Sequence, residues 1–194
     1  MSQASGKYLK SGELMSRGTS RLLVVDVQEK LVSRIFECDR LLANCCRLAR
    51  AANILQVPAF VTEQYAKGLG PTVPQLAELL PPPPDKLRFS CAEALNWGMA
   101  TEQTDDRFQV VVAGIEAHVC ILQTVLDLLS HGYQVFVPAD AVSSRGELNW
   151  RIALERMAGC GATITSTESV LFEWCEVAGT PEFKQISQLV KDGP

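Results

Sequence analysis

The segment Arg21-Leu-Leu-Val-Val-Asp26 is a nearly continuous apolar run that ends in a carboxylate. Short uninterrupted runs of this kind are typical of strands in a parallel sheet, because helices cover both faces of such a sheet. The run therefore predicts a buried central strand. It also places Asp26 at the carboxyl end of that strand, and this is the edge where open α/β sheets bind their ligands.

Strand and helix patterns alternate along the rest of the chain, which predicts βαβ units with right-handed crossovers. Strands are expected at 58–62, 108–113, 133–137 and 162–165, and helices at 39–56 (with Asp39 as N-cap), 90–101, 118–130, 147–157 and beyond 165. Six prolines and two glycines make 63–84 a long surface loop with at most a short helix at 75–80. We expect an α/β, three-layer, Rossmann-like fold with a mainly parallel sheet of about six strands flanked by helices. It should form one domain, 20–190, after an N-terminal tail, 1–19.

Composition excludes several classes of protein. The 194 residues include 18 Lys and Arg against 22 Asp and Glu, a net charge of -4, which leaves no basic excess for binding nucleic acid. No apolar run reaches the roughly 18 residues of a membrane span, so no membrane partner is expected. The seven cysteines include no CxxC pair, and only two histidines are available to complete a zinc site. We interpret the cysteines as mostly reduced thiols and expect a cytoplasmic protein.

Candidate site residues follow from the strand ends. These are Asp26, Gln28, Glu63, Gln64, the segment 114–120 and Asp140. Cys120 is the best nucleophile candidate, because free N–H groups and the positive end of the helix that follows would favour its thiolate. Spacing alone leaves an alternative open, in which Cys120 is a small apolar residue in a buried corner. Asp26 alone could bind a metal, cap a loop or act as a base. Lys86 could be a surface lysine, and His118 could orient a substrate or simply pack.

Five segments together resemble the isochorismatase-like superfamily of cysteine hydrolases, and most of all its isochorismatase domain-containing proteins. They are VVDVQEKL (24–31), TEQYAKGLGPTVPQL (62–76), KLRFSC (86–91), GIEAHVCILQTVLDLLSHGYQVFVPADAVSSR (114–145) and TSTESVLFEW (165–174). The resemblance extends over residues 20–187. Members of the family are commonly dimers or larger, so it implies a homo-oligomer.

The resemblance also implies an Asp–Lys–Cys triad, which maps to Asp26, Lys86 and Cys120. In this scheme Asp26 accepts the thiol proton and Lys86 holds the carboxylate. Cys120 then attacks a carbonyl to form a thioester that water hydrolyses. The family's non-proline cis peptide maps to Ile115–Glu116, and it would direct the backbone N–H groups of Glu116 and Cys120 at the oxyanion. Substrate contacts are expected from Gln28, Gln64, Glu116 and His118.

Two departures from related enzymes narrow the expected chemistry. Nicotinamidases carry an Asp-x-His pair where this chain has Thr62-Glu-Gln-Tyr65, so no metal and no cofactor is expected. Isochorismate hydrolases cleave a vinyl ether and commonly lack the cysteine, so Cys120 favours an amide-type C–N bond. The sequence thus predicts a metal-independent cysteine hydrolase of a small amide or related acyl compound. The alternatives are a non-catalytic binding protein and an ether hydrolase with Asp26 as the acid.

Overall fold

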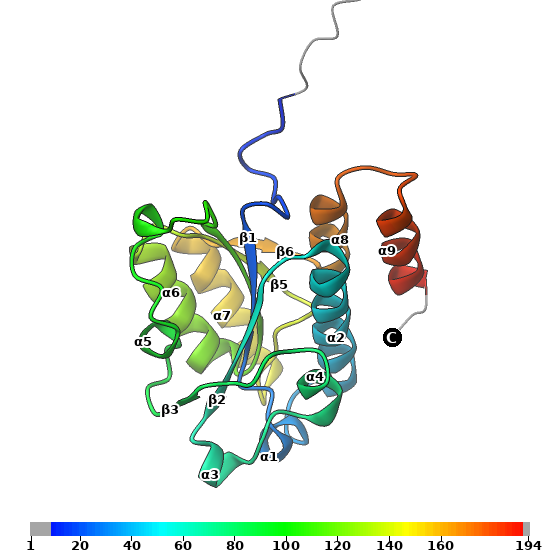
Figure 1. Cartoon of the computed structure of the whole chain (residues 1–194). Coiled ribbons are helices and arrows are strands. Elements are labelled where there is room, and N and C mark those ends of the chain that lie inside the picture. Colours follow the sequence, from blue (N-terminus) through cyan, green and yellow to red (C-terminus); the bar gives the residue numbers. More distant parts are fainter. Residues whose placement is uncertain (1–8, 192–194) are drawn as a thin grey trace, which may run out of the picture.

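A single parallel sheet organises the chain in the computed structural model, which describes residues 9–191 (Figure 1). Its six strands lie in the order β3-β2-β1-β4-β5-β6. The strands are β1 Ser20–Val25, β2 Ala59–Gln64, β3 Asp85–Lys86, β4 Gln109–Gly114, β5 Gln134–Pro138 and β6 Thr163–Thr165. All pairs are parallel, so the predicted α/β fold and its sheet of about six strands are confirmed.

Helices cover both faces of the sheet. On one side lie α2 Cys38–Leu55, α8 Thr167–Cys175 and α9 Pro181–Lys191, and on the other lie α6 Leu122–Ser130 and α7 Glu147–Gly159 (Figure 1). Strand β1 is buried throughout because its side chains alternate between the two layers. Leu22 and Val24 pack toward α2, whereas Leu23 and Val25 pack toward α6. The unbroken apolar run is therefore explained by two cores that share one strand.

Short elements connect the strands and helices, and several of them lie around the carboxyl ends of the strands. They are α1 Glu29–Val32, α3 Ala66–Leu69, α4 Pro74–Ala77, α5 Ala92–Leu95, a 3-10 turn at Ala100–Glu102 and a π-helical turn at Ala117–Ile121. Strand β1 runs downward in Figure 1, so α1 and α3 at the lower end mark this carboxyl edge. The residues that follow β1, β2 and β4 are consequently brought toward one rim.

Gly114 allows β4 to approach β1 closely. Its φ is +115°, and a Cβ built on it would lie 2.2 Å from the carbonyl oxygen of Val25. Ile115 then donates its N–H to that same oxygen at 2.9 Å. A residue with a side chain would push the two central strands apart. The glycine therefore fixes where the chain leaves β4 and enters the turn that carries Cys120.

Several local predictions were wrong in detail. Helix α2 begins at Cys38, so Asp39 lies in its first turn rather than at the N-cap. Its negative charge still interacts favourably with the positive end of the helix. The predicted helix 90–101 is two short turns, because Asn96 and Gly98 take left-handed φ values of 49° and 70° between them. The loop 63–84 holds α3 and α4, and the expected first turn of helix 118–130 is π-helical.

The N-terminal segment is partly described. Residues 1–8 of the predicted tail lie outside the described residues, and Met15 is fully buried in the core beneath α2 and α8. The predicted domain boundaries stay a prediction. Within residues 9–191, none of the helices combines the length and the apolar character needed to cross a membrane.

Candidate active site

Asp26 lies at the end of β1, and its side chain is almost fully buried. Its backbone takes a left-handed φ of 53°, which aspartate tolerates better than most residues. Thr62, on neighbouring β2, makes two hydrogen bonds with Asp26. The Asp26 N–H donates to the Thr62 carbonyl at 3.1 Å, and the Thr62 hydroxyl donates to Asp26 Oδ1 at 2.8 Å. The second carboxylate oxygen, Oδ2, faces Lys86.

Lys86 is a buried cation rather than a surface lysine. Its Nζ lies 2.7 Å from Asp26 Oδ2 and 2.7 Å from Gln64 Oε1, and the carbonyl oxygens of Phe89 and Arg88 lie 3.0 and 3.3 Å away. Only 3% of the side chain is exposed. An ammonium buried to this degree needs both a charge partner and satisfied hydrogen bonds. The short strand β3 supplies the position, since it pairs with β2 at Glu63 and Gln64.

Cys120 lies in the π-helical turn that follows β4, and its Sγ is 4.0 Å from Gln64 Oε1. Burial raises the pKa of this thiol, and the charge and hydrogen bonding of Asp26 raise it further, while Lys86 lowers it. The helix end was expected to lower the pKa of Cys120, but the effects that raise this pKa are larger. The sulfur is buried, and the Lys86 ammonium is already paired with Asp26. The resting form is therefore the thiol beside a carboxylate.

The predicted cis peptide bond is present at Ile115–Glu116. In the turn that follows, Ala117 donates its N–H to the Ser143 carbonyl at 2.7 Å, and the Val119 and Ile121 N–H groups reach the Glu116 carbonyl at 3.0 and 3.2 Å. These bonds fix the turn without using the Glu116 and Cys120 amides. Those two amides remain the predicted oxyanion donors.

The four predicted substrate contacts have different surroundings. Gln28 is fully buried, and its side-chain amide bonds only backbone groups, namely the Gln64 N–H, the Gln64 carbonyl and the Gly70 carbonyl. The Gln64 side chain accepts a hydrogen bond from Lys86 and donates one to the Leu87 carbonyl. This geometry gives Gln28 a positioning role, because it fixes the segment that holds Gln64. Its contact with substrate stays a prediction.

Glu116 and His118 are held by the loop after β5. Glu116 Oε2 accepts the Arg145 backbone N–H at 3.1 Å and its Nε–H at 2.9 Å, and His118 Nδ1 lies 2.9 Å from the Ser144 hydroxyl. Asp140 is not brought to the triad, since its carboxylate accepts the N–H and hydroxyl of Thr167 at the start of α8. The Asp140 carboxylate thus satisfies a backbone N–H at the start of α8.

Three residues that contact the candidate triad residues or one another, Thr62, Cys91 and Thr124, were not predicted. Cys91 has its Sγ 3.4 Å from the Thr62 hydroxyl. Burial and the Asp26 charge raise the pKa of the Cys91 thiol. Thr124 donates to the Cys120 carbonyl at 2.6 Å and accepts the Cys91 N–H at 3.0 Å. The only available signal was the spacing of four between Cys120 and Thr124 in a helix.

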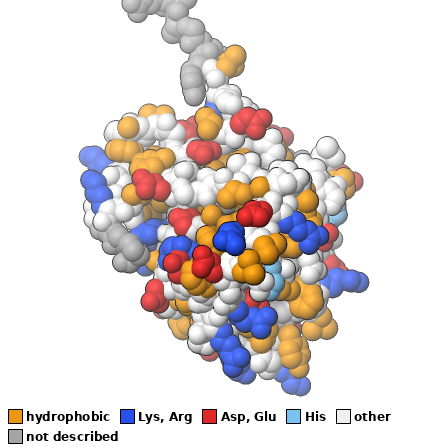
Figure 2. All heavy atoms as spheres, turned by 180° about the vertical axis from the view of Figure 1, so that it is seen from behind, with side chains coloured by type: hydrophobic (Ala, Val, Ile, Leu, Met, Phe, Trp, Pro, Cys, Tyr) orange, Lys and Arg blue, Asp and Glu red, His pale blue; other side chains and the backbone are white. Residues whose placement is uncertain are grey.

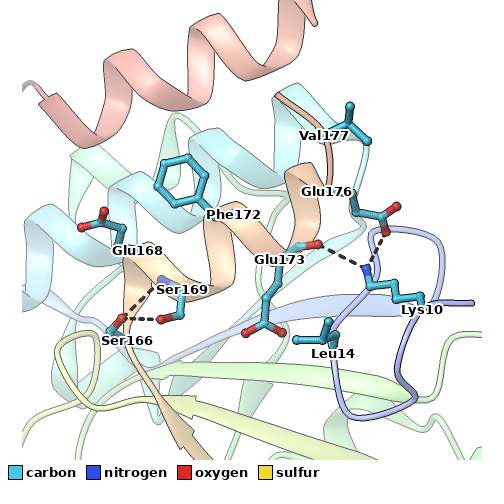
Figure 3. A pocket seen from close by; sticks show the side chains of 9 residues that line it. All are labelled: Lys10, Leu14, Ser166, Glu168, Ser169, Phe172, Glu173, Glu176 and Val177. Carbon is cyan, nitrogen blue, oxygen red and sulfur yellow. Dashed lines mark hydrogen bonds and ion pairs between the residues drawn. The ribbon is translucent and has the colours of Figure 1, made fainter. Parts of the chain in front are cut away.

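A hollow of about 640 Å³ lies along α8 and the N-terminal segment, and no triad residue lines it (Figure 3). Two of its three acidic side chains already have partners. Glu173 accepts the Met15 N–H at 2.8 Å, and Glu176 pairs with Lys10 at 2.7 Å. Another hollow, of about 620 Å³, is lined by Lys86, so size does not distinguish the two. The buried cluster around Cys120 is the candidate chemical site, because it combines a thiol, a carboxylate and an ammonium ion.

Comparison with known proteins gives matches over most of the chain. The pattern of the isochorismatase domain matches residues 20–169. The secreted isochorismatase effector Isc1 of Phytophthora sojae is 40% identical over 99% of this chain and 93% of its own length. Isochorismatase domain-containing protein 2 of Danio rerio is 41% identical, over 92% and 90% of the two chains. A structure described as MAR1 ribonuclease from Caenorhabditis elegans is 38% identical, covers 92% of each chain and has a TM-score of 0.81.

These relatives differ in what their names state. One is named as a secreted effector and another as a ribonuclease. The cytoplasmic location and the absence of a nucleic-acid partner, both expected from this sequence, therefore stay predictions.

Proposed function

Because this chain belongs to the isochorismatase family, we propose that it is a metal-independent cysteine hydrolase acting on a small amide or a related C–N or acyl substrate. The observation that carries the proposal is that one ammonium ion contacts two parts of the site, and that one of these parts faces the thiol. Lys86 Nζ binds Asp26 and Gln64 at 2.7 Å each, and Gln64 faces the Cys120 sulfur. A nucleophile, a base and an electrostatic anchor are thus held together in a buried setting.

The first half of the proposed reaction forms an acyl-enzyme. Asp26 takes the proton from Cys120, and the thiolate sulfur attacks the substrate carbonyl carbon. The oxygen becomes an oxyanion, which the Glu116 and Cys120 amides stabilise. Asp26 then returns its proton to the amide nitrogen, the C–N bond breaks and the amine leaves. A thioester remains on Cys120.

The second half restores the thiol. The Asp26 carboxylate takes a proton from water, and the resulting hydroxide attacks the thioester carbonyl. The tetrahedral intermediate expels the Cys120 thiolate, which recovers the proton from Asp26, and the carboxylic acid product departs. Lys86 stays bonded to Asp26 Oδ2, and Oδ1, which accepts the Thr62 hydroxyl, has a second lone pair for proton transfer. The raised pKa of the Cys120 thiol fits this role for Asp26, since a base is needed to generate the thiolate.

An ammonia-release assay with a panel of primary amides tests this proposal, combined with acid quenching and intact-mass measurement of the protein. Wild type should release ammonia and carry an acyl adduct on Cys120. Cys120→Ala should do neither, and Asp26→Asn should lose about 10²- to 10⁴-fold in turnover, as expected for loss of a general base. Cys160→Ala is the matched control, because Cys160 is an exposed thiol at the end of α7.

The alternatives give different results in the same experiment. An ether hydrolase would keep its activity on a vinyl ether in Cys120→Ala and lose it in Asp26→Asn. A non-catalytic binding protein would bind a panel compound and release no product. Cleavage of an RNA oligonucleotide that survives in Cys120→Ala would favour the activity for which one relative is named. Each of these outcomes would overturn the cysteine mechanism.

A further inference from the structure

A hollow of about 340 Å³ reaches the turn that carries Cys120. Its walls come from α1 and the residues after it, from the end of α3, and from the loops after β4 and β5. The lining residues are Lys30, Leu31, Arg34, Ile35, Leu69, Glu116 and Arg145. Glu116 connects the hollow to the proposed reaction, since its backbone N–H is one of the two oxyanion donors. A substrate held at Cys120 would extend into this space.

Positive charge predominates in the hollow. It contains three cations and one carboxylate, and that carboxylate, Glu116, is paired with Arg145 at 2.9 Å. Lys30 Nζ donates to the Gly68 carbonyl at 2.9 Å, a bond that leaves its charge uncompensated. The Arg34 guanidinium has no hydrogen-bond or ion-pair partner within residues 9–191. The excess of two positive charges contrasts with the net charge of -4 for the chain.

Lys and Arg side chains also lie elsewhere at this end of the molecule. Figure 2 shows Lys and Arg side chains at the lower end of the molecule, the end where α1 and α3 lie in Figure 1. A cleft lined by one sign of charge concentrates ligands of the opposite sign. The apolar walls from Leu31, Ile35 and Leu69 strengthen this effect by reducing the water around the charges.

The two arginines in the hollow indicate which kind of anion it would bind. Arginine presents a planar fork of N–H donors that matches a carboxylate, and Arg34 has all of its donors available. Arg145 uses only its Nε–H and its backbone N–H for Glu116. The hollow is at the small end of the usual range for ligand pockets, roughly 300–1,000 Å³, so the ligand is a small molecule.

We propose that the substrate is a small amide bearing a carboxylate at the end remote from the scissile bond, and that Arg34, assisted by Arg145, binds that carboxylate. This inference rests on the proposed function and adds the substrate class. The monoamide of a short dicarboxylic acid has the required groups. Its amide carbonyl would lie at Cys120, its methylene groups against the apolar wall, and its carboxylate at Arg34.

Succinamate and succinamide test the inference, because they differ only in whether the remote group is a carboxylate or an uncharged amide. In wild type the kcat/KM for succinamate should exceed that for succinamide by at least about tenfold, the scale of a hydrogen bond to a charged group. Arg34→Gln should reduce this ratio to near 1. Arg156→Gln should keep the wild-type ratio, since Arg156 is exposed in the last turn of α7 and does not line the hollow. High salt should reduce the wild-type ratio.

Equal kcat/KM values for the two amides would overturn the inference and leave the cysteine mechanism standing. An equal loss on both amides in Arg34→Gln would also overturn it. If neither amide is hydrolysed, protection of Cys120 from alkylation by iodoacetamide tests whether a carboxylate binds at Arg34. Succinate should protect wild type better than succinamide does and lose that advantage in Arg34→Gln. The failure of the proposed function has a separate signature, namely that no amide in the panel acylates Cys120.

Discussion

Lys86 Nζ lies 2.7 Å from Asp26 Oδ2, and the two side chains are only 3% and 1% exposed. Their charges are therefore stable only in each other's presence. Lys86→Met should lower the free energy of unfolding by about 3–5 kcal/mol, because it leaves a buried carboxylate unpaired. The double variant Asp26→Asn/Lys86→Met should recover part of this loss. Urea denaturation of the two single variants and the double variant measures the coupling.

An exposed ion pair provides the control. Arg88 and Glu93 lie 2.6 Å apart with 77% and 71% of their side chains exposed. Arg88→Met should change the free energy of unfolding by less than about 1 kcal/mol, since water screens such pairs. Similar losses for Lys86→Met and Arg88→Met would show that the buried pair has no special role in stability.

Asp26→Asn should separate thiol reactivity from turnover. The Asp26 carboxylate raises the pKa of Cys120, so its removal lowers that pKa and leaves the Lys86 charge to favour the thiolate. Iodoacetamide should alkylate Cys120 faster at pH 7.5 in this variant than in wild type, while amide turnover falls. Alkylation rates at several pH values, read by peptide mass spectrometry, test this. Slower alkylation across the whole pH range would contradict the assigned electrostatics.

Gly114→Ala should be strongly destabilising. A Cβ at this position would lie 2.2 Å from the Val25 carbonyl oxygen, and the φ of +115° is unfavourable for alanine. We expect a loss of at least about 3 kcal/mol in urea denaturation. Gly159→Ala, in helix α7, is the matched control, because its Cβ would meet nothing within 4 Å beyond its own helix, and alanine favours helices by up to about 1 kcal/mol. An unaltered midpoint in Gly114→Ala would mean that β1 and β4 can separate without cost.

Stability should fall at alkaline pH because of buried thiols. Burial raises the pKa of fully buried Cys45 above the ordinary thiol value of 9.0. The folded state therefore keeps this proton while the unfolded state releases it, so the contribution is complete below pH 9.0 and is lost as pH rises above that value. Each such thiol costs about 1.4 kcal/mol per pH unit there. Urea denaturation at pH 7.5, 9.5 and 10.5 should give a shallower decline for Cys45→Ala than for wild type. If the stability of both proteins falls equally with pH, Cys45 does not contribute to the alkaline loss of stability.

The sequence predicts the central strands correctly because their burial on both faces leaves an unbroken apolar run. Strand β3 leaves no such signal. It has only two residues, Asp85 and Lys86, and it follows four consecutive prolines. Only its pairing with Glu63 and Gln64 makes it a strand. The position of Lys86 therefore depends on long-range pairing, and motif resemblance indicated its role where periodicity could not.

The polar partners of the site were harder to predict for a related reason. Thr62 and Cys91 are small side chains whose roles depend on contacts with residues distant in the chain. The same applies to the thiol pKa. The helix end after β4 predicts a lower pKa for Cys120, but burial and Asp26 reverse the direction. Local sequence gives the residue types, and three-dimensional packing determines their electrostatics.

Activity should survive removal of metal ions. At the triad the Lys86 ammonium already occupies the position between the Asp26 and Gln64 oxygens that a divalent cation would need, and its charge repels such an ion. The other oxygen and nitrogen ligands nearby are also engaged. Glu63 accepts the N–H and hydroxyl of Thr72 at 2.6 and 2.8 Å, and His118 contacts Ser144. Amide turnover after dialysis against a chelator should therefore equal that of untreated protein. A loss that zinc or manganese restores would replace the cysteine-only mechanism with a metal-assisted one.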